Sequence, residues 1–272
     1  MVRRSALSVG ALALVVGVAL FPLLAGCSSG VGPPPASLGL VQDRAVPASV
    51  AGIPLYGPSG RRTDLAGLKG KVALIAPFMT LCTEMCPITT GELGKVVAAL
   101  RTAGLEGKVA VIEISIDPGR DTPERLSAYA KMAGATWPLL TTTPPSSTPP
   151  SPLPSAPSSA LANLASIARF FGWLHQTVPE GSPPATDWWT GKPLTYDVDH
   201  SDGFVLLDRS GRVRFETVAP ATTGGVLKGP LRSILDSQGL HNLASPASTA
   251  WTVADALDAI GWLRGSAIPG SS

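Results

Sequence analysis

The sequence predicts an α/β fold in which a central sheet is covered by helices on both faces. Apolar runs typical of strands alternate with segments of helical spacing between residues 72 and 174. A β-hairpin follows the last long helical segment and adds antiparallel strands to a sheet that begins as a parallel one. With one hairpin before the first strand and an extension at the end, this order predicts a thioredoxin-like three-layer sandwich with an N-terminal hairpin and a C-terminal extension.

We expect one domain over residues 50–238, and its first half is the most regular part. The turn-forming residues 57–60 (Gly-Pro-Ser-Gly) predict a hairpin. The apolar run 72–78 predicts a buried strand, and helical spacing of apolar residues follows it from Ile88 to Leu100. A second apolar run, 109–116, predicts the neighbouring strand.

The second half of the domain is interrupted by a segment of biased amino-acid composition. Residues 141–159 are mostly Thr, Pro and Ser, which predicts a surface insertion, because proline lacks the amide donor that helices and central strands need. The remaining elements we expect are a helix over 121–132, a strand over 138–140, a helix over 160–174, a hairpin over 203–215 and a helix over 225–237. We expect residues 239–272 to form a tail whose amphipathic stretch at 253–263 could be a helix, either packed on the domain or mobile.

The N-terminus indicates export. Arg3 and Arg4 precede an apolar run that ends in Leu24-Ala25-Gly26-Cys27, which resembles the lipobox of bacterial lipoproteins. We therefore expect a signal peptide over 1–26, lipidation of Cys27 and a flexible tether over 27–49. The alternative is an uncleaved transmembrane helix. The lipoprotein reading places the domain at the cell membrane, lipid-anchored on the extracytoplasmic face.

The charge of the chain gives no indication of a nucleic-acid partner. The sequence has 21 Lys and Arg residues against 19 Asp and Glu residues, and two of the basic residues, Arg3 and Arg4, lie in the expected signal peptide. Binding to a phosphate backbone normally requires a basic surface. We expect no nucleic acid among the partners.

Cys82 and Cys86 form the most informative motif of the chain. They follow the first predicted strand and are followed at once by Pro87, which suits the first position of a helix. The free amides and positive dipole of a helix N-terminus favour thiolate, the form that binds metals and attacks disulfides. Two thiolates suit Cu(I), whereas a closed zinc site usually needs four protein ligands. A disulfide enclosing three residues would add little stability.

The third ligand is sought among three histidines. His175 and His241 are read as ordinary helix-end or surface residues. His200 lies just before the strand predicted from Phe204, in a loop that a thioredoxin-like sheet places against the cysteine-bearing helix. His200 could therefore complete a Cys2His site, although a solvated loop histidine remains the simpler reading of this residue alone.

Together these segments resemble the SCO/SenC family of copper chaperones, which act in cytochrome oxidase assembly. Four segments carry the resemblance: Gly70-Lys71-Val72, the C-x-x-x-C-P motif at 82–87, Ser115-Ile-Asp117-Pro118-Gly-Arg120-Asp121-Thr122-Pro123, and Val198-Asp199-His200. The resemblance implies that Cys82, Cys86 and His200 bind copper as Cu(I) or Cu(II), and that Asp117 supports the site without being a ligand. It also implies a cytochrome oxidase subunit or another copper acceptor as partner. Thr83-Glu84 replaces the family's usual Pro-Asp.

Two other functions remain open. The chain could be a thiol-disulfide oxidoreductase in which Cys82 attacks a partner disulfide and Cys86 resolves the mixed disulfide, with a thiol reductase as a further partner. Such enzymes usually carry C-x-x-C, one residue shorter than the motif here. The chain could also be a lipoprotein in which the cysteines form an inert disulfide. A redox-active disulfide and copper binding are compatible, because oxidised cysteines cannot hold copper.

Overall fold

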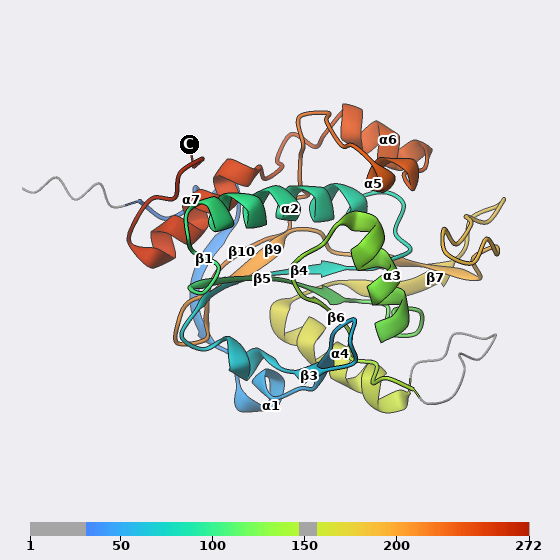
Figure 1. The fold of residues 1–272 in the computed structure, drawn as a ribbon, viewed down its shortest axis with the longest axis horizontal. Coiled ribbons are helices and arrows are strands. Elements are labelled where there is room, and N and C mark those ends of the chain that lie inside the picture. The colour runs from blue at the N-terminus through green and yellow to red at the C-terminus, as the bar shows by residue number, and fades with distance from the viewer. Residues whose placement is uncertain (1–30, 147–156, 272) are drawn as a thin grey trace, which may run out of the picture.

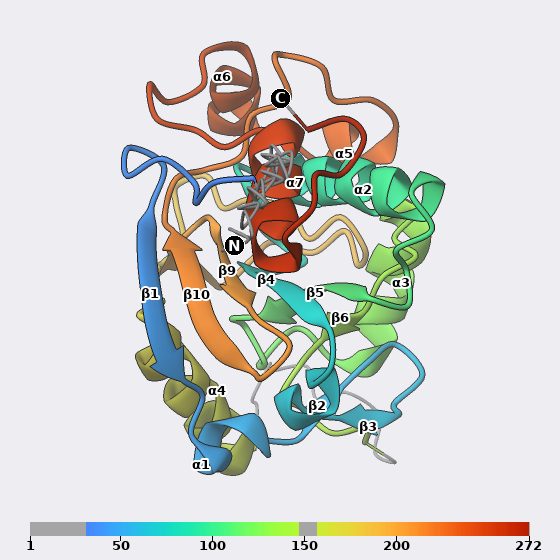
Figure 2. The same cartoon turned by 90° about the vertical axis from the view of Figure 1, so that its left-hand side faces the viewer.

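The centre of the fold is a mixed sheet between helices. The computed structural model describes residues 31–146 and 157–271. Within them the main sheet has six strands, and Figure 2 shows β1 and β10 at one edge of it. In spatial order the strands are β1 (Leu40–Ala45), β10 (Arg212–Thr217), β9 (Phe204–Leu207), β4 (Val72–Phe78), β5 (Val109–Ser115) and β6 (Leu139–Leu140).

The strand directions confirm the thioredoxin-like prediction. β4 pairs with β5, and β5 with β6, in parallel register, whereas β9 pairs with β4, and β10 with β9, in antiparallel register. The unit therefore runs strand, helix, parallel strand, helix, and then an antiparallel hairpin that returns beside the first strand. The expected N-terminal hairpin is also present as β2 (Leu55–Tyr56) and β3 (Arg62–Thr63).

Helices cover both faces of this sheet (Figure 1). One face carries α2 (Cys86–Thr102) and α7 (Val253–Arg264), and α3 (Pro123–Ala133) lies at the end of the sheet where β6 runs. The opposite face carries α1 (Ala48–Ala51) and α4 (Ser158–Phe171), and a 3₁₀ turn, Leu65–Leu68, contacts α1. A third group, α5 (Pro230–Ser233) and α6 (Ser237–Ala244), lies above α2.

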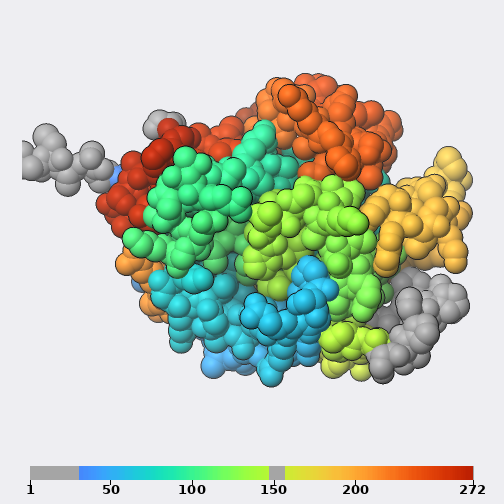
Figure 3. Space-filling model, viewed as in Figure 1, coloured from blue at the N-terminus to red at the C-terminus, as the bar shows by residue number. Residues whose placement is uncertain are grey.

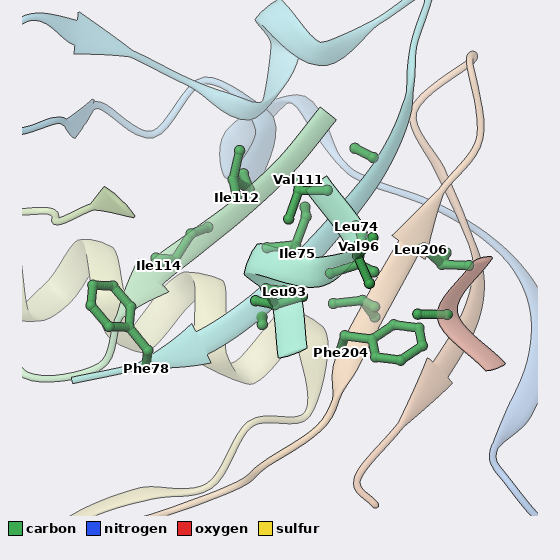
Figure 4. Close-up of a cluster of buried hydrophobic side chains, with 14 of the residues drawn as sticks. Leu74, Ile75, Phe78, Leu93, Val96, Val111, Ile112, Ile114, Phe204 and Leu206 are labelled. Carbon is green, nitrogen blue, oxygen red and sulfur yellow. The ribbon is translucent and has the colours of Figure 1, made fainter. Parts of the chain in front are cut away.

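The core forms where α2 packs on the central strands. Leu93 and Val96 of α2 lie over Leu74 of β4 and Val111 of β5, all at most 5% exposed (Figure 4). These residues occupy the positions that helical spacing and the two apolar runs predict as buried. Since β4 is buried along its whole length, the loop that follows it starts from a rigid strand end.

The N-terminal part of the chain is more ordered than we expected. β1 lies inside the segment 27–49, which we expected to be a flexible tether, and α1 begins inside this segment and continues past its end. β1 pairs with β10 as an edge strand, and Gly39 lies so close to it that a Cβ atom would stand 2.6 Å from the Phe215 ring. The expected signal peptide and Cys27 lie outside the described residues. No helix in the described segments is both long enough and apolar enough to span a membrane.

One prediction in the C-terminal half needs correction. The expected helix over 225–237 is confined to the single turn of α5, because glycines in the left-handed region at 224, 225 and 229 and then Pro230 interrupt it. The amphipathic stretch predicted at 253–263 does form a helix, α7, and of its two expected alternatives the packed one is found: α7 packs on α2 and β4, and Trp251 and Ile260 are fully buried. A capping box between Thr252 and Asp255 begins this helix.

The Pro-rich insertion is anchored at both ends. Thr141 makes a bridge with Tyr56, and the Thr142 hydroxyl donates to the Ala160 carbonyl of α4 at 2.9 Å. The centre of the insertion, residues 147–156, lies outside the described residues. The ordered ends place the insertion between β6 and α4, beside the N-terminal hairpin.

Candidate metal site

Both cysteines lie at the start of α2, as the motif predicts. Cys86 is the first residue of the helix, and Cys82 lies in the loop that joins it to β4. The Cys86 amide donates to Cys82 Sγ at 3.3 Å, and the Met79 amide donates to Cys86 Sγ at 3.4 Å. Both thiols are free. The helix N-terminus thus supplies an amide donor to Cys82, and the start of the loop after β4 supplies one to Cys86; such donors stabilise thiolate.

His200 reaches the cysteines from a strand rather than from the loop that we expected. It is the last residue of β8 (Tyr196–His200), which forms a two-stranded antiparallel sheet with β7 (His175–Pro179). β7 has no apolar alternation from which to predict it, and β8 has only the short alternation Tyr-Asp-Val-Asp. The strand fixes the direction of the His200 side chain. Its imidazole lies next to the cysteine loop, although His200 and Cys86 are 114 positions apart in the sequence.

The three donor atoms are close enough to share one metal ion. Cys86 Sγ and His200 Nε2 are 3.7 Å apart, and the donor atoms of Cys82, Cys86 and His200 all lie within 4.8 Å of one another. Donors around one ion, at about 2.3 Å for sulfur and about 2.0 Å for nitrogen, stand about 3.5–4 Å apart. In the part of the chain that the structure describes, these three residues form the one close group of potential ligands.

The imidazole presents the correct nitrogen to the sulfurs. His200 Nδ1 lies 3.0 Å from the Ser201 carbonyl oxygen, which can only accept a hydrogen bond. In the neutral ring this places the proton on Nδ1 and leaves the lone pair of Nε2 facing Cys86. Two sulfurs and one imidazole nitrogen are soft to intermediate ligands, the set that favours copper over hard cations.

The charges in the site are strongly coupled. A hydrogen bond from Cys86 lowers the pKa of Cys82, with His200 adding to the effect against the opposing effect of burial. Burial raises the pKa of Cys86, and the neighbouring Cys82 raises it further. Burial opposes the imidazolium of His200, but the hydrogen bond to Cys82 and its charge raise the His200 pKa to about 10. The lowered pKa of Cys82 and the raised pKa of His200 both favour a thiolate–imidazolium pair in the metal-free site.

The site opens into an acidic cavity. This cavity of about 500 Å³ lies between the cysteine loop, β8 and the connection from β7 to β8. None of its lining residues is Lys or Arg, and its acidic lining residues are Glu84, Glu180, Asp197, Asp199, Asp202 and Asp236. A mouth lined by one sign of charge concentrates counter-ions, so this mouth favours the approach of cations.

Asp117 is linked to His200 through the strand that carries it. It is buried after β5, and it accepts hydrogen bonds from Arg120 Nε and, at 2.8 Å, from the Tyr196 hydroxyl. Arg120 also donates to the Tyr196 carbonyl at 2.7 Å, and its guanidinium lies 3.8 Å from the Tyr196 ring centre. Tyr196 and His200 share one face of β8. Sequence reasoning missed Tyr196, although its position four residues before His200 was a usable signal.

Asp121, at the start of the predicted helix 121–132, does not cap α3. Thr122 caps α3, with its hydroxyl accepting from the Arg125 amide at 3.3 Å. Asp121 is instead fully buried and accepts hydrogen bonds from the Thr80 amide and the Ser115 hydroxyl, at 3.2 Å and 2.6 Å. The Thr80 carbonyl accepts from Trp188 Nε1 at 2.7 Å. These bonds fix the chain two residues before Cys82.

The remaining histidines lie outside the donor group. His175 pairs in register with His200 on β7 but is not part of the close group of ligands. His241 is exposed on α6. Both positions agree with the sequence prediction that His200 alone could join the cysteines.

Comparison with known proteins agrees with these observations. The SCO1/SenC family model matches residues 54–145, which include the cysteine motif and Asp117. Over this segment the chain is similar to the SCO1/SenC family. His200 lies beyond the matched segment, so its part in the site rests on the geometry described above.

Individual members of the family are only distantly similar. A "putative copper-binding protein" of Stutzerimonas stutzeri is 25% identical over 199 residues, which cover 73% of this chain and 81% of that protein. The SCO1 protein homolog of Bacillus subtilis (strain 168) is 31% identical over 80 residues, which cover 29% of this chain and 38% of that protein. The structure of Bradyrhizobium japonicum ScoI with copper bound is 24% identical, with a TM-score of 0.45, and the match covers 70% of this chain and 94% of that chain.

Proposed function

We propose that this protein binds one copper ion through Cys82, Cys86 and His200 and passes it to an acceptor protein. The observation that carries the proposal is the group of three donor atoms within 4.8 Å of one another. The acidic mouth and the absence of Lys and Arg from its lining support a cationic cargo. A relative named as a putative copper-binding protein matches this chain over 81% of its own length, which supports copper as the metal.

The geometry suggests how the cargo is held and released. Copper would displace the protons of Cys86 and His200 and bind the Cys82 thiolate directly, since metal ligands must be deprotonated. An acceptor could then replace the ligands one at a time with its own sulfur or imidazole groups, with no change in the oxidation state of copper. His200 is the least buried of the three ligands and is the first candidate for replacement.

Copper titration of the reduced soluble domain tests this proposal. Wild type should bind one Cu(I) per chain, Cys86→Ser should lose most of the affinity, and His200→Ala should bind more weakly. His175→Ala is the matched control, because it removes a histidine from the paired position of the same small sheet. Wild-type affinity in His200→Ala would exclude the imidazole from the site.

The cellular role is proposed from the family resemblance and from the N-terminal motif. We propose that the acceptor is a copper centre of cytochrome c oxidase, and that lipidated Cys27 anchors the domain on the extracytoplasmic face of the membrane. Mass spectrometry of the mature protein tests the anchor: the expected N-terminus is a diacylated Cys27, and an intact Met1 would contradict it. Deletion of the gene should lower the copper content of the oxidase, and expression of a Cys86→Ser variant should not restore it.

Thiol-disulfide exchange is the second candidate function. The lowered pKa of the Cys82 thiol favours it, because thiolate is the attacking species. In that reaction two electrons and two protons pass from Cys82 and Cys86 to a partner disulfide. The burial of both sulfurs, with Cys82 5% and Cys86 2% exposed, disfavours direct attack on a protein substrate. Turnover of a disulfide substrate by protein without copper affinity would favour this function.

A further inference from the structure

The loop between the two cysteines is hydrogen-bonded to residues 225–244, the segment that contains α5 and α6 and is called the extension below. The Asp236 amide donates to the Thr83 carbonyl at 3.1 Å, and the Thr83 hydroxyl donates to Asp236 Oδ2 at 2.8 Å. Thr83 directly follows Cys82, so these two bonds act next to a proposed metal ligand. The two residues are separated by 153 positions in the sequence.

A glycine allows the extension to come this close. A Cβ atom on Gly239 would lie 2.3 Å from the Thr83 carbonyl oxygen and 3.1 Å from Glu84 Cα. Such distances are far below normal contact, and the atoms in the way belong to the backbone, which cannot rotate aside. Asp236 also accepts from the Gly239 amide at 2.8 Å through Oδ1 and so begins α6. One carboxylate therefore both caps α6 and holds the cysteine loop.

The extension is itself fixed to the helix that begins at Cys86. Leu227, Leu231 and Leu235 are buried, and a Cβ atom on Gly91 of α2 would lie 2.6 Å from Leu227 Cδ1. Figure 3 shows the extension, in orange, lying against the surface of the green helices, and Figure 1 shows α5 and α6 above the start of α2. The cysteine loop is thus attached at one end to α2 and at Thr83 to a segment packed on α2.

We propose that Asp236 and Gly239 are positioning residues for the metal site. By holding Thr83, they keep Cys82 Sγ buried and directed toward Cys86 and His200, so that the three donors are arranged before the metal arrives. A preorganised site binds more tightly because less conformational freedom is lost on binding. The proposal rests on the proposed copper function for its affinity readout, but the arrangement of the thiol can be measured without metal.

The first experiment removes one hydroxyl. Thr83→Val keeps the shape of the side chain and deletes the bond to Asp236, whereas Thr83→Ser keeps the hydroxyl. Because this hydrogen bond is exposed, we take the net worth of an ordinary hydrogen bond, a factor of about 5–10 in an equilibrium. We expect Thr83→Val to bind Cu(I) about 5–10-fold more weakly, to alkylate faster at Cys82 in the metal-free reduced protein, and to keep its melting temperature within about 3 °C. Thr83→Ser should restore both wild-type values.

The second experiment uses the close approach at Gly239. Gly239→Ala should weaken Cu(I) binding more than Thr83→Val does, because the added methyl group forces the backbone of α6 away from the loop. Gly107→Ala is the control, since a Cβ atom there meets nothing within 4 Å. If Gly239→Ala does not fold, the Thr83 pair alone decides the matter.

The outcomes separate this inference from the proposed function. Wild-type Cu(I) affinity and wild-type Cys82 alkylation in Thr83→Val would overturn the positioning role. A wild-type protein that binds no copper would overturn the proposed function instead, and the difference in alkylation between Thr83→Val and Thr83→Ser would still test the contact between the loop and the extension.

Discussion

The Tyr196 hydroxyl donates a 2.8 Å hydrogen bond to the buried carboxylate of Asp117, which ties the strand that carries His200 to the chain leaving β5. Asp117 itself is held by Arg120, which also bonds the Tyr196 backbone. His200 is therefore the last residue of a strand, β8, whose first residue, Tyr196, is held by these hydrogen bonds. Its distance from the cysteines depends on a contact that is not part of the donor group.

Removing the Tyr196 hydroxyl should loosen His200 without removing it. Tyr196→Phe keeps the ring under Arg120 and leaves Asp117 without one of its donors, a loss of about 1–2 kcal/mol. We expect Cu(I) affinity to fall toward the value of His200→Ala and no further, as measured by competition with a Cu(I) chelator. Tyr56→Phe, on the distant N-terminal hairpin, is the control. Unchanged affinity in Tyr196→Phe would show that the hydrogen bond to Asp117 does not set the position of His200.

The pH dependence of stability should reveal the buried Glu113. Burial raises the pKa of this carboxyl to about 7, although Trp137 and Thr90 donate hydrogen bonds to it. Between about pH 4.5 and 7 the folded state binds more protons at this position than the unfolded state, so its contribution to stability is lost as the pH rises through that window. The contribution of Glu113 to the free energy of unfolding should therefore be smaller at pH 7.5 than at pH 5, and Glu113→Gln should remove this difference.

Denaturant unfolding across this window measures the term. The difference in unfolding free energy between wild type and Glu113→Gln should change with pH by on the order of 1–3 kcal/mol and become flat above about pH 7. Glu124→Gln, which removes an exposed carboxyl at the start of α3, should show no such trend. If the difference in unfolding free energy is constant from pH 4.5 to 8, the raised pKa of Glu113 is contradicted.

The C-terminal helix should be required for the fold itself. Trp251 is fully buried and packs edge-on against Phe204 of β9, with 5.2 Å between ring centres. Trp251→Ala should cost about 3–5 kcal/mol of unfolding free energy, because it leaves a large cavity beside the sheet. Trp189→Ala should cost far less, since Trp189 is 46% exposed. Equal losses in the two variants would show that α7 does not pack as described.

The sequence was informative wherever apolar residues followed a regular period. The runs that became β4 and β5, and the helical spacing of α2, give the central part of the fold and place both cysteines at a strand-to-helix junction. β1, β7 and β8 were missed because their stability comes from pairing with other strands rather than from an apolar face. The sequences of β1 and β7 carry no such period, and that of β8 has only the short alternation Tyr-Asp-Val-Asp.

The site was predictable only as a set of residue types. Cys82, Cys86 and His200 were indicated by motifs, and the structure brings them together. Tyr196 and Asp236 were not indicated, because each acts through a partner far away in the sequence, at separations of 79 and 153 positions. Contacts of this kind depend on the tertiary arrangement; the local pattern indicates only that Tyr196, four residues before His200, would share its face of a strand.

X-ray absorption spectroscopy of the copper-loaded domain tests the central claim most directly. For reduced wild type with one equivalent of Cu(I), we predict a first shell of two sulfur atoms and one imidazole nitrogen, and loss of the imidazole signal in His200→Ala. A spectrum with sulfur ligands alone, or an imidazole signal that persists in His200→Ala, would contradict it.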